Sequence, residues 1–278
     1  MDVFISVDME GIAGITTMRQ ILRGTDDYPR SRQLMTDEAN AAVLGALEGG
    51  ATRLVVSDSH GDMGNLLPDR LDKRAELVAG TPKLPWSMLT GIGPDFACAL
   101  FVGYHAGAGT EAAVMDHTYT GFFFDVRLNG ESWNETHLNA ALCGSFGVPV
   151  GLVTGDDKCC EQAKRLKGVR TVAVKQGIGR HVAVSLSPPA AHERIKRAAL
   201  ETVRGASDLL VFKPKPPFQL EVDMVNTSCT ELAALAPDTE RTGPRTVRYE
   251  GADIRETMRC LLAWMQLARP AAPTYTVD

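Results

Sequence analysis

The chain has no long hydrophobic run, no cluster of basic residues and few aromatic side chains. Of its 278 residues, 6% are aromatic and 23% are charged, with a formal net charge of −5. Nucleic-acid phosphates are bound by basic faces, so we expect no nucleic-acid partner. No apolar stretch approaches the ~20 residues that span a bilayer, and the acidic Asp2 stands where a signal peptide would carry positive charge. We therefore expect no membrane partner and a cytoplasmic location.

Cysteine is also scarce. The six cysteines are scattered and form no C-x-x-C pair, which excludes a disulfide framework in a chain of this length. Cys98 and Cys143 lie in apolar segments and are predicted to be core residues. Cys159 and Cys160 follow an acidic turn on an expected helix, where buried packing is favoured over a reactive thiol.

Apolar runs alternate with helical patterns through the first half of the chain. The predicted strands are 3–7, 53–60, 97–105, 148–157 and 169–174. The predicted helices are 36–51 with Thr36 as N-cap, 134–147 with Asn134 as N-cap, and 158–168. Strand–helix–strand alternation with near-continuous apolar strands indicates an α/β fold, in three layers, with a mostly parallel sheet and helices on both faces.

The pattern changes after about residue 180. A helix is predicted over 187–205, strands over 217–225 and 245–251, and an amphipathic helix over 253–268, before a loose tail at 269–278. Earlier in the chain, Asn129–Gly130 within 122–133 is typical of a type I′ hairpin. We therefore predict an α/β metal-binding catalytic domain over 1–180 and a smaller α+β C-terminal domain over 181–278.

Polar clusters follow the predicted parallel strands, where such sheets bind their ligands. These clusters are Asp8 and Glu10, residues 57–60, His105, and Asp156 with Asp157. Side chains alternate along a strand, so Asp8 and Glu10 point the same way. Because two neighbouring buried carboxylates repel each other, a cation is expected beside them.

Imidazole and carboxylate are the ligand set of zinc, which makes His60 and His105 candidate ligands. One metal needs about three or four ligands, and a pair of metals needs more and a bridging carboxylate. Asp8 suits the bridge. Glu135, Asp58 and Asp62 are candidates to complete the set, and spacing does not choose among them.

Nine short motifs along the chain resemble one family. They are "SVDMEG", "MTDEAN", "VSDSH", "GYHA", "VMDH", "NETHLNA", "VTGDD", "AVKQ" and "LSP". "SVDMEG" resembles the S-x-D-x-E-G hallmark of the zinc-dependent D-aminopeptidases encoded with bacterial dipeptide-transport genes. The likeness covers most of the chain in order.

This resemblance implies a site with two zinc ions per chain, and it implies a ligand set and a catalytic residue. The implied ligands are Asp8 as bridge, Glu10, His60, His105 and Glu135. The implied catalytic residue is His117, described for the family as a nucleophile. The resemblance also implies short peptide substrates with N-terminal D-residues such as D-Ala, and a ring-like homo-decamer with its active sites facing an enclosed channel. Two positions depart from the family pattern, His137 and Gly107.

Chemical reasoning leaves two roles open. A bound zinc supplies a water that ionises near neutral pH, so we favour an acid/base or oxyanion role for His117 over direct attack. Asp156 and Asp157 either orient ligand histidines or cap the following helix, and capping is favoured.

Two other functions would use the same scaffold. A magnesium-dependent phosphatase of the haloacid-dehalogenase type would use Asp8 as its phosphorylated nucleophile, Glu10 as its acid and Ser57 as a phosphate contact. That scheme leaves the histidines without a role, and their imidazoles favour zinc over magnesium. A metal-free sugar- or peptide-binding module on the same scaffold is the non-enzymatic alternative. The residues favour a zinc aminopeptidase.

Overall fold

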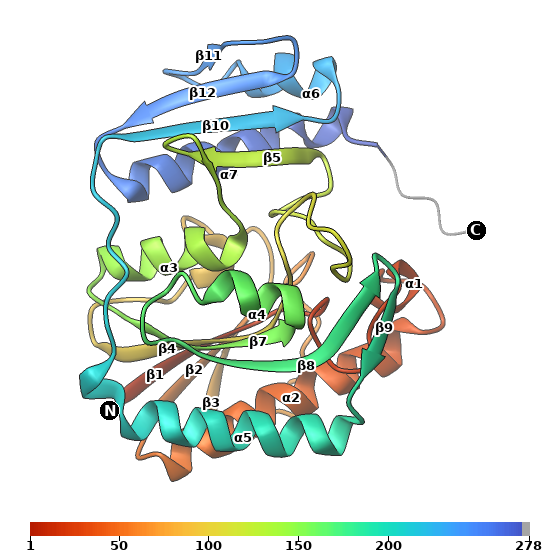
Figure 1. Cartoon of the computed structure of the whole chain (residues 1–278), viewed down its shortest axis with the longest axis vertical. Helices are drawn as coiled ribbons and strands as arrows, with labels where there is room; N and C mark the ends of the chain where they lie inside the picture. The colour runs from red at the N-terminus through yellow and green to blue at the C-terminus, as the bar shows by residue number, and fades with distance from the viewer. Residues whose placement is uncertain (274–278) are drawn as a thin grey trace.

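The computed structural model describes residues 1–273, which form two sheets (Figure 1). The larger sheet has seven strands in the order β3-β2-β1-β4-β7-β8-β9. Its strands are β1 (Asp2–Val7), β2 (Arg53–Asp58), β3 (Ala75–Val78), β4 (Phe96–Tyr104), β7 (Val150–Asp156), β8 (Arg170–Gly179) and β9 (Val182–Ser185). All neighbours pair in parallel except β8 and β9. The predicted α/β fold with a mostly parallel sheet is confirmed.

Helices cover both faces of this sheet (Figure 1). One face packs on α2 (Tyr28–Glu48) and α5 (Pro188–Arg204), and the other on α3 (Glu135–Ser145) and α4 (Asp157–Ala163). Alternation along β1 supplies both cores, since Val3 and Ile5 face α2 and α5 while Phe4 faces the opposite side.

The second sheet has five strands in the order β11-β12-β10-β5-β6, all antiparallel. Its strands are β5 (Phe123–Leu128), β6 (Glu131–Ser132), β10 (Phe218–Met224), β11 (Glu240–Arg241) and β12 (Thr246–Gly251). Helix α6 (Thr227–Ala233) connects β10 to β11, and α7 (Ile254–Ala268) follows β12. The second sheet contains strands from both sides of residue 180, and α5 packs on the larger sheet. The division into two domains at that residue stays a prediction.

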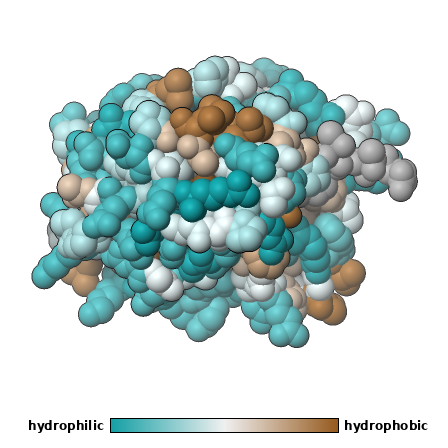
Figure 2. Space-filling view, turned by 90° about the horizontal axis from the view of Figure 1, so that it is seen from above, coloured by the Kyte–Doolittle hydropathy of each residue, from teal (hydrophilic) through white to brown (hydrophobic). Residues whose placement is uncertain are grey.

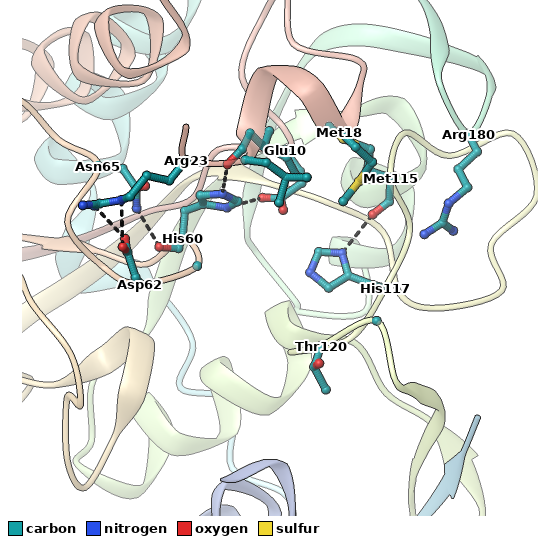
Figure 3. Close-up of a pocket in the computed structure, with 14 residues that line it drawn as sticks. Glu10, Met18, Arg23, His60, Asp62, Asn65, Met115, His117, Thr120 and Arg180 are labelled. Atoms are coloured by element: carbon teal, nitrogen blue, oxygen red, sulfur yellow. Dashed lines mark hydrogen bonds and ion pairs between the residues drawn. The ribbon is translucent and has the colours of Figure 1, made fainter. Parts of the chain in front are cut away.

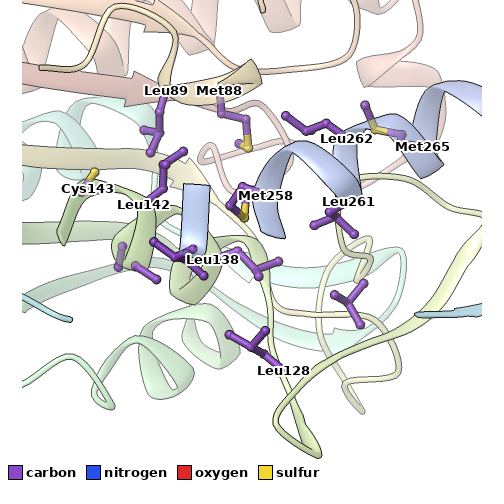
Figure 4. Close-up of a cluster of buried hydrophobic side chains, with 14 of the residues drawn as sticks. Met88, Leu89, Leu128, Leu138, Leu142, Cys143, Met258, Leu261, Leu262 and Met265 are labelled. Atoms are coloured by element: carbon purple, nitrogen blue, oxygen red, sulfur yellow. The ribbon is translucent and has the colours of Figure 1, made fainter. Parts of the chain in front are cut away.

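One hydrophobic core joins the second sheet to the first (Figure 4). Leu138 and Leu142 of α3 meet Met258 and Leu261 of α7, and Leu128 of β5 closes the cluster. Because α3 also carries a predicted ligand, this core fixes the helix that presents it.

Local signals explain most of the helix ends, with one correction. Helix α2 begins at Tyr28 with Pro29 in its first turn, not at Thr36. The Thr36 hydroxyl donates to the Arg32 carbonyl at 2.7 Å, so it bonds within the helix instead of capping it. Asn134 caps α3 as predicted, its side chain accepting from His137 N at 3.0 Å. The hairpin is confirmed, since Asn129 and Gly130 both have positive φ.

The short elements were not predicted from the sequence. They are α1 (Met18–Ile21), β3, β9, α6, β11 and the 3-10 turns η1 (Ser87–Leu89), η2 (Ala206–Asp208) and η3 (Arg269–Ala271). The predicted tail begins with η3, and its last five residues, 274–278, lie outside the described part of the chain. Across residues 1–273, every helix is too short or too polar to cross a bilayer. The face above the second sheet is mostly hydrophilic, with small separate hydrophobic patches (Figure 2).

Candidate metal centre

The predicted ligands meet at the carboxyl edge of three adjacent strands. Asp8 follows β1, His60 follows β2, and His105 follows β4. The strand order reverses at β1, so this edge is the switch point where doubly wound sheets bind ligands. Glu10 comes two residues after Asp8, and Glu135 is the first residue of α3.

Asp8 lies between two histidines, and each of its oxygens faces a different ring. Asp8 Oδ1 is 3.4 Å from His60 Nδ1, and Asp8 Oδ2 is 3.4 Å from His105 Nε2. On one side, His60 Nδ1 is 2.9 Å from Glu10 Oε2. On the other, His105 Nε2 is 3.2 Å from Glu135 Oε1. The shared position of Asp8 is what a bridging carboxylate requires.

Each histidine of the cluster turns one ring nitrogen to a backbone carbonyl. The pairs are His60 Nε2 with Ile21 O at 3.1 Å, His105 Nδ1 with Ala106 O at 3.0 Å, and His117 Nδ1 with Met115 O at 2.9 Å. A carbonyl only accepts hydrogen bonds, so in the neutral rings these nitrogens carry the proton and the other nitrogens present lone pairs. The buried His105 Nε2 has no hydrogen-bond partner. Lone pairs and carboxylates facing one another require a cation or protons between them.

The pKa values of the cluster express the same demand for positive charge. Burial opposes ionisation of His105, but Glu135 and Asp8 outweigh it and raise its pKa to about 10. Burial, with Glu10 beside it, raises the pKa of Asp8 to about 8. Burial disfavours the Glu10 carboxylate too, yet the facing His60 holds its pKa well below the usual range. A divalent cation would meet this demand in place of protons.

His117 adds a third imidazole from the loop between β4 and β5. Its ring stacks on that of His105, with centroids 3.9 Å apart and planes 12° apart, and its Nε2 is 3.7 Å from Glu135 Oε1. Burial and the neighbouring His105 lower its pKa, so the ring is neutral. Its side chain is 22% exposed, whereas those of the five predicted ligands are 9% exposed or less. His117 is therefore the most exposed member of the cluster.

Two groups of donor atoms lie close enough to hold an ion. They are His105 with His117 and Glu135, and Asp8 with Glu10 and His105; within each group the atoms lie within 4.8 Å of one another. Nitrogen and oxygen donors of this kind suit zinc. The residues therefore fit the metal that the resemblance implies.

Two cavities border the cluster and share Glu10, His60 and His117. The first, of about 360 Å³, has an apolar wall (Figure 3) made of Met18, Ile21, Leu22 and Met115. The second, of about 330 Å³, reaches Asp8 and Glu135 and has a mainly polar wall of Ser59, Ser87, Thr81 and Tyr119, with Met265 and Arg269 at α7. A substrate at the cluster thus meets an apolar side and a polar side.

Asp58 and Asp62, the alternative ligands, are occupied elsewhere. Asp58 Oδ2 accepts from the backbone N–H groups of Asn65 at 2.5 Å and Leu66 at 2.7 Å, so it shapes the loop after β2. Asp62 Oδ2 pairs with Arg23 Nε at 2.9 Å on the surface. Glu135 is the candidate that the structure brings to the cluster.

Asp156 is an N-cap, the favoured alternative. It accepts from Cys159 N at 2.7 Å at the start of α4 and from Val114 N at 2.8 Å, and does not bond a ligand histidine. Asp157 accepts from Gly177 N at 2.8 Å instead. Cys159 and Cys160 are buried, and burial raises the pKa of the Cys160 thiol to about 12, which supports packing over reactivity.

The two positions that depart from the family pattern, His137 and Gly107, contact other residues than the predicted ligands. His137 Nε2 donates to the Gln162 carbonyl at 3.1 Å. A Cβ at Gly107 would lie 2.9 Å from Asn134 Cβ, so a side chain there would displace the cap of α3. Glycine at this position thus protects the helix that carries Glu135.

Lys175 and Glu38 were missed by the sequence reasoning. The Lys175 ammonium donates to the carbonyls of Glu10, Ile12 and Ile15, which fixes the loop carrying Glu10. Glu38 Oε1 accepts from Ala13 N at 2.8 Å in the same loop. A lysine that ends an apolar strand, in "VAVK", was the available signal.

The fold and the centre together are those of a metal-dependent hydrolase of the α/β class. More particularly, the chain belongs to the D-aminopeptidase family (Peptidase_M55), whose model matches residues 1–263. It is 36% identical to a D-aminopeptidase of Bacillus subtilis over 273 residues, 96% of this chain and 98% of that protein. The solved structure of the Zn-dependent D-aminopeptidase DppA from Bacillus subtilis, described as a self-compartmentalizing protease, matches with a TM-score of 0.93 and 35% identity over 97% of this chain and 98% of the other. The predicted family is confirmed, and the phosphatase alternative has no support.

Proposed function

We propose that the chain is an aminopeptidase with two zinc ions, held by Asp8, Glu10, His60, His105 and Glu135, that removes N-terminal D-residues from short peptides. The observation that carries the proposal is the orientation of the histidines. His60 and His105 each give one N–H to a carbonyl and aim the other nitrogen at Asp8. That arrangement is typical of metal-ligating histidines.

The proposed chemistry divides between the metals and His117. Bound zinc lowers the pKa of a coordinated water to about 7 and polarises a peptide carbonyl. His117 Nδ1–H is held by the Met115 carbonyl, so Nε2 is the atom free to exchange a proton. A neutral ring next to both cavities can accept a proton there and return it to the leaving amine. This geometry favours an acid/base role for His117 over direct attack.

Several finer features are carried over from the relatives. The D-aminopeptidase relative supports a preference for N-terminal D-residues, and the family resemblance adds small ones such as D-Ala. The self-compartmentalizing relative supports assembly into a closed homo-oligomer, and the family resemblance adds that it is a decamer. A cytoplasmic location completes the proposal.

The test compares His117→Ala with wild type on D-Ala and L-Ala p-nitroanilides after purification without added metal. Wild type should carry about two zinc ions per chain, release D-Ala faster, and lose activity on chelation. His117→Ala should keep the zinc and lose on the order of 10²–10⁴-fold in kcat, the usual contribution of general acid–base catalysis.

His192→Ala is the matched control, since His192 lies on α5, away from the metal centre. It should behave as wild type. Protein that carries no zinc, or activity that survives chelation, would contradict the metal centre. Loss of zinc in His117→Ala would make His117 a ligand instead of a proton carrier.

A further inference from the structure

Three arginines border the two cavities, and two of them are neutralised. Arg23 at the apolar cavity pairs with Asp62, Nε to Oδ2 at 2.9 Å. Arg180 at the same cavity pairs with Asp116. Arg269 borders the polar cavity, and no carboxylate of residues 1–273 lies within ion-pair distance of it. Among the residues that the structure describes, its guanidinium is the one at these cavities without a carboxylate partner.

The fold sets Arg269 at this cavity through α7. Arg269 is the C-cap of α7, and Met265, one turn earlier, lines the same cavity. Met265 is anchored in the core that joins α7 to α3 (Figure 4). The Arg269 carbonyl accepts from Ala272 N at 3.1 Å, which closes the turn that follows. The backbone that carries this guanidinium is therefore held in place.

Opposite charges border the same cavity. Asp8, Glu10 and Glu135 belong to the metal cluster, and Arg269 stands at the wall formed by α7. Between them the wall is mostly neutral and polar, with Ser59, Ser87, Thr81 and Tyr119. A molecule with a reacting carbonyl at the cluster and a carboxylate at its other end matches this distribution of charge.

Other cations nearby are occupied. Lys83 Nζ donates to Ser57 Oγ at 2.5 Å and to the Asp58 carbonyl at 2.6 Å. Arg259, about three turns before Arg269, lies over the Trp86 ring with its Cζ 5.6 Å from the centroid. It borders only the neighbouring cavity, which Arg269 borders as well. Of these three cations, only Arg269 borders the polar cavity.

We propose that Arg269 binds the C-terminal carboxylate of the substrate, so that a peptide with a free C-terminus is preferred over the same peptide with its C-terminus blocked. The inference rests on the proposed function, because it requires a peptide cleaved at the metal cluster. A guanidinium forms paired hydrogen bonds with a carboxylate, and these fix its orientation.

The experiment measures kcat and KM for D-alanyl-D-alanine and for its C-terminal amide, with wild type, Arg269→Gln and Arg259→Gln. Wild type should prefer the free acid. Arg269→Gln should raise KM for the acid about tenfold, as expected for a lost hydrogen bond to a charged group, and leave the amide unchanged. Arg259→Gln, on the same helix, should change neither.

Several results would overturn the proposal. The first is that wild type hydrolyses the acid and the amide equally well. The second is that Arg269→Gln raises KM equally for both substrates, and the third is that Arg269→Gln leaves KM for the acid unchanged. Failure of zinc-loaded wild type to hydrolyse either substrate rejects the proposed function instead. Calorimetric binding of the acid and the amide then decides on Arg269: weaker binding of the acid alone in Arg269→Gln supports it, and unchanged binding overturns it.

Discussion

Two groups of buried charges lie against the loop after β1 and are neutralised in different ways. In the metal cluster, the carboxylates of Asp8, Glu10 and Glu135 face histidines. Asp8 Oδ1 also accepts from Met9 N at 2.9 Å, and Glu135 Oε1 from Tyr119 N at 2.6 Å. Beside the same loop, Lys175 supplies an ammonium that donates to three carbonyls. The second group carries its own cation, whereas the carboxylates of the first need protons on the histidines or a bound cation.

The comparison shows that buried charge does not by itself indicate a metal site. Lys175 is as buried as Glu10, yet its donors are used within the protein. What distinguishes the metal cluster is that its three carboxylates face imidazoles, and no lysine or arginine of residues 1–273 forms an ion pair with them. The loop after β1 depends on both groups, since Glu10 gives its side chain to one and its carbonyl to the other.

The largest effect is expected from Asp8→Asn, which removes the carboxylate shared by both halves of the cluster. Metal catalysis contributes several kcal/mol, so kcat/KM should fall by about 10³-fold or more. Zinc content should fall with it, measured by mass spectrometry. Full zinc content in Asp8→Asn would contradict its bridging position.

Lys175→Met should have the next largest effect, because it leaves three carbonyls without their donor. A buried polar group left without its partner costs about 1–3 kcal/mol, so the free energy of unfolding should fall by at least about that much, measured by urea unfolding of chelated protein. Since the loop carries Glu10, zinc affinity should fall about 10–100-fold, as for other outer-shell changes. Lys196→Met, at an exposed ion pair with Glu48, is the control and should change neither quantity.

A pH effect is expected at Glu38. Burial raises its pKa from 4.5 to about 7, and its Oε2 has no partner. The folded protein binds this proton more tightly than the unfolded chain, so wild type loses stability as pH rises from 4.5 to 7. Glu38→Gln lacks this loss, and its stability relative to wild type should rise by roughly 3 kcal/mol across that range. Urea unfolding of both proteins is measured at pH 4.5 and 7.5 with chelator present. An equal difference in stability between wild type and Glu38→Gln at the two pH values would contradict a raised pKa at Glu38.

The smallest effect is expected at an exposed pair. Arg23 and Asp62 lie at the mouth of the apolar cavity with side chains 60% and 44% exposed. Exposed ion pairs contribute at most about 1 kcal/mol, so Asp62→Asn should change the free energy of unfolding by less than that and leave zinc content unchanged. A larger change would mean that this exposed pair contributes to stability as the buried charges do, which would contradict the comparison.

Much of the centre could be predicted because parallel strands bring their ends together. Asp8, Glu10, His60 and His105 are all read from strand ends. Glu135 required the family resemblance, because spacing does not reveal that backbone N–H groups already use Asp58. His117 lies on an irregular loop, where no periodicity places a side chain.

The rest depends on contacts between distant segments. Pairing of β5 with β10 joins residues about ninety positions apart, as in the bond from Gln219 N to Asn129 Oδ1. Patterns within either strand do not specify that partner. The start of α2 was predicted wrongly although a local signal was available. Pro29 in the first turn, two residues after the N-cap Asp27, marks the true start, whereas the prediction took Thr36 as the N-cap.

The residues of the metal cluster and the residues of its far wall come from opposite ends of the chain. The cluster lies within residues 8–135, whereas Met265 and Arg269 belong to the last helix. With the proposed role of Arg269, bond cleavage and recognition of the substrate's C-terminus depend on separate segments of the chain. Exchange of the C-terminal segment between relatives is then expected to change the preferred C-terminus of the substrate without changing the metal cluster.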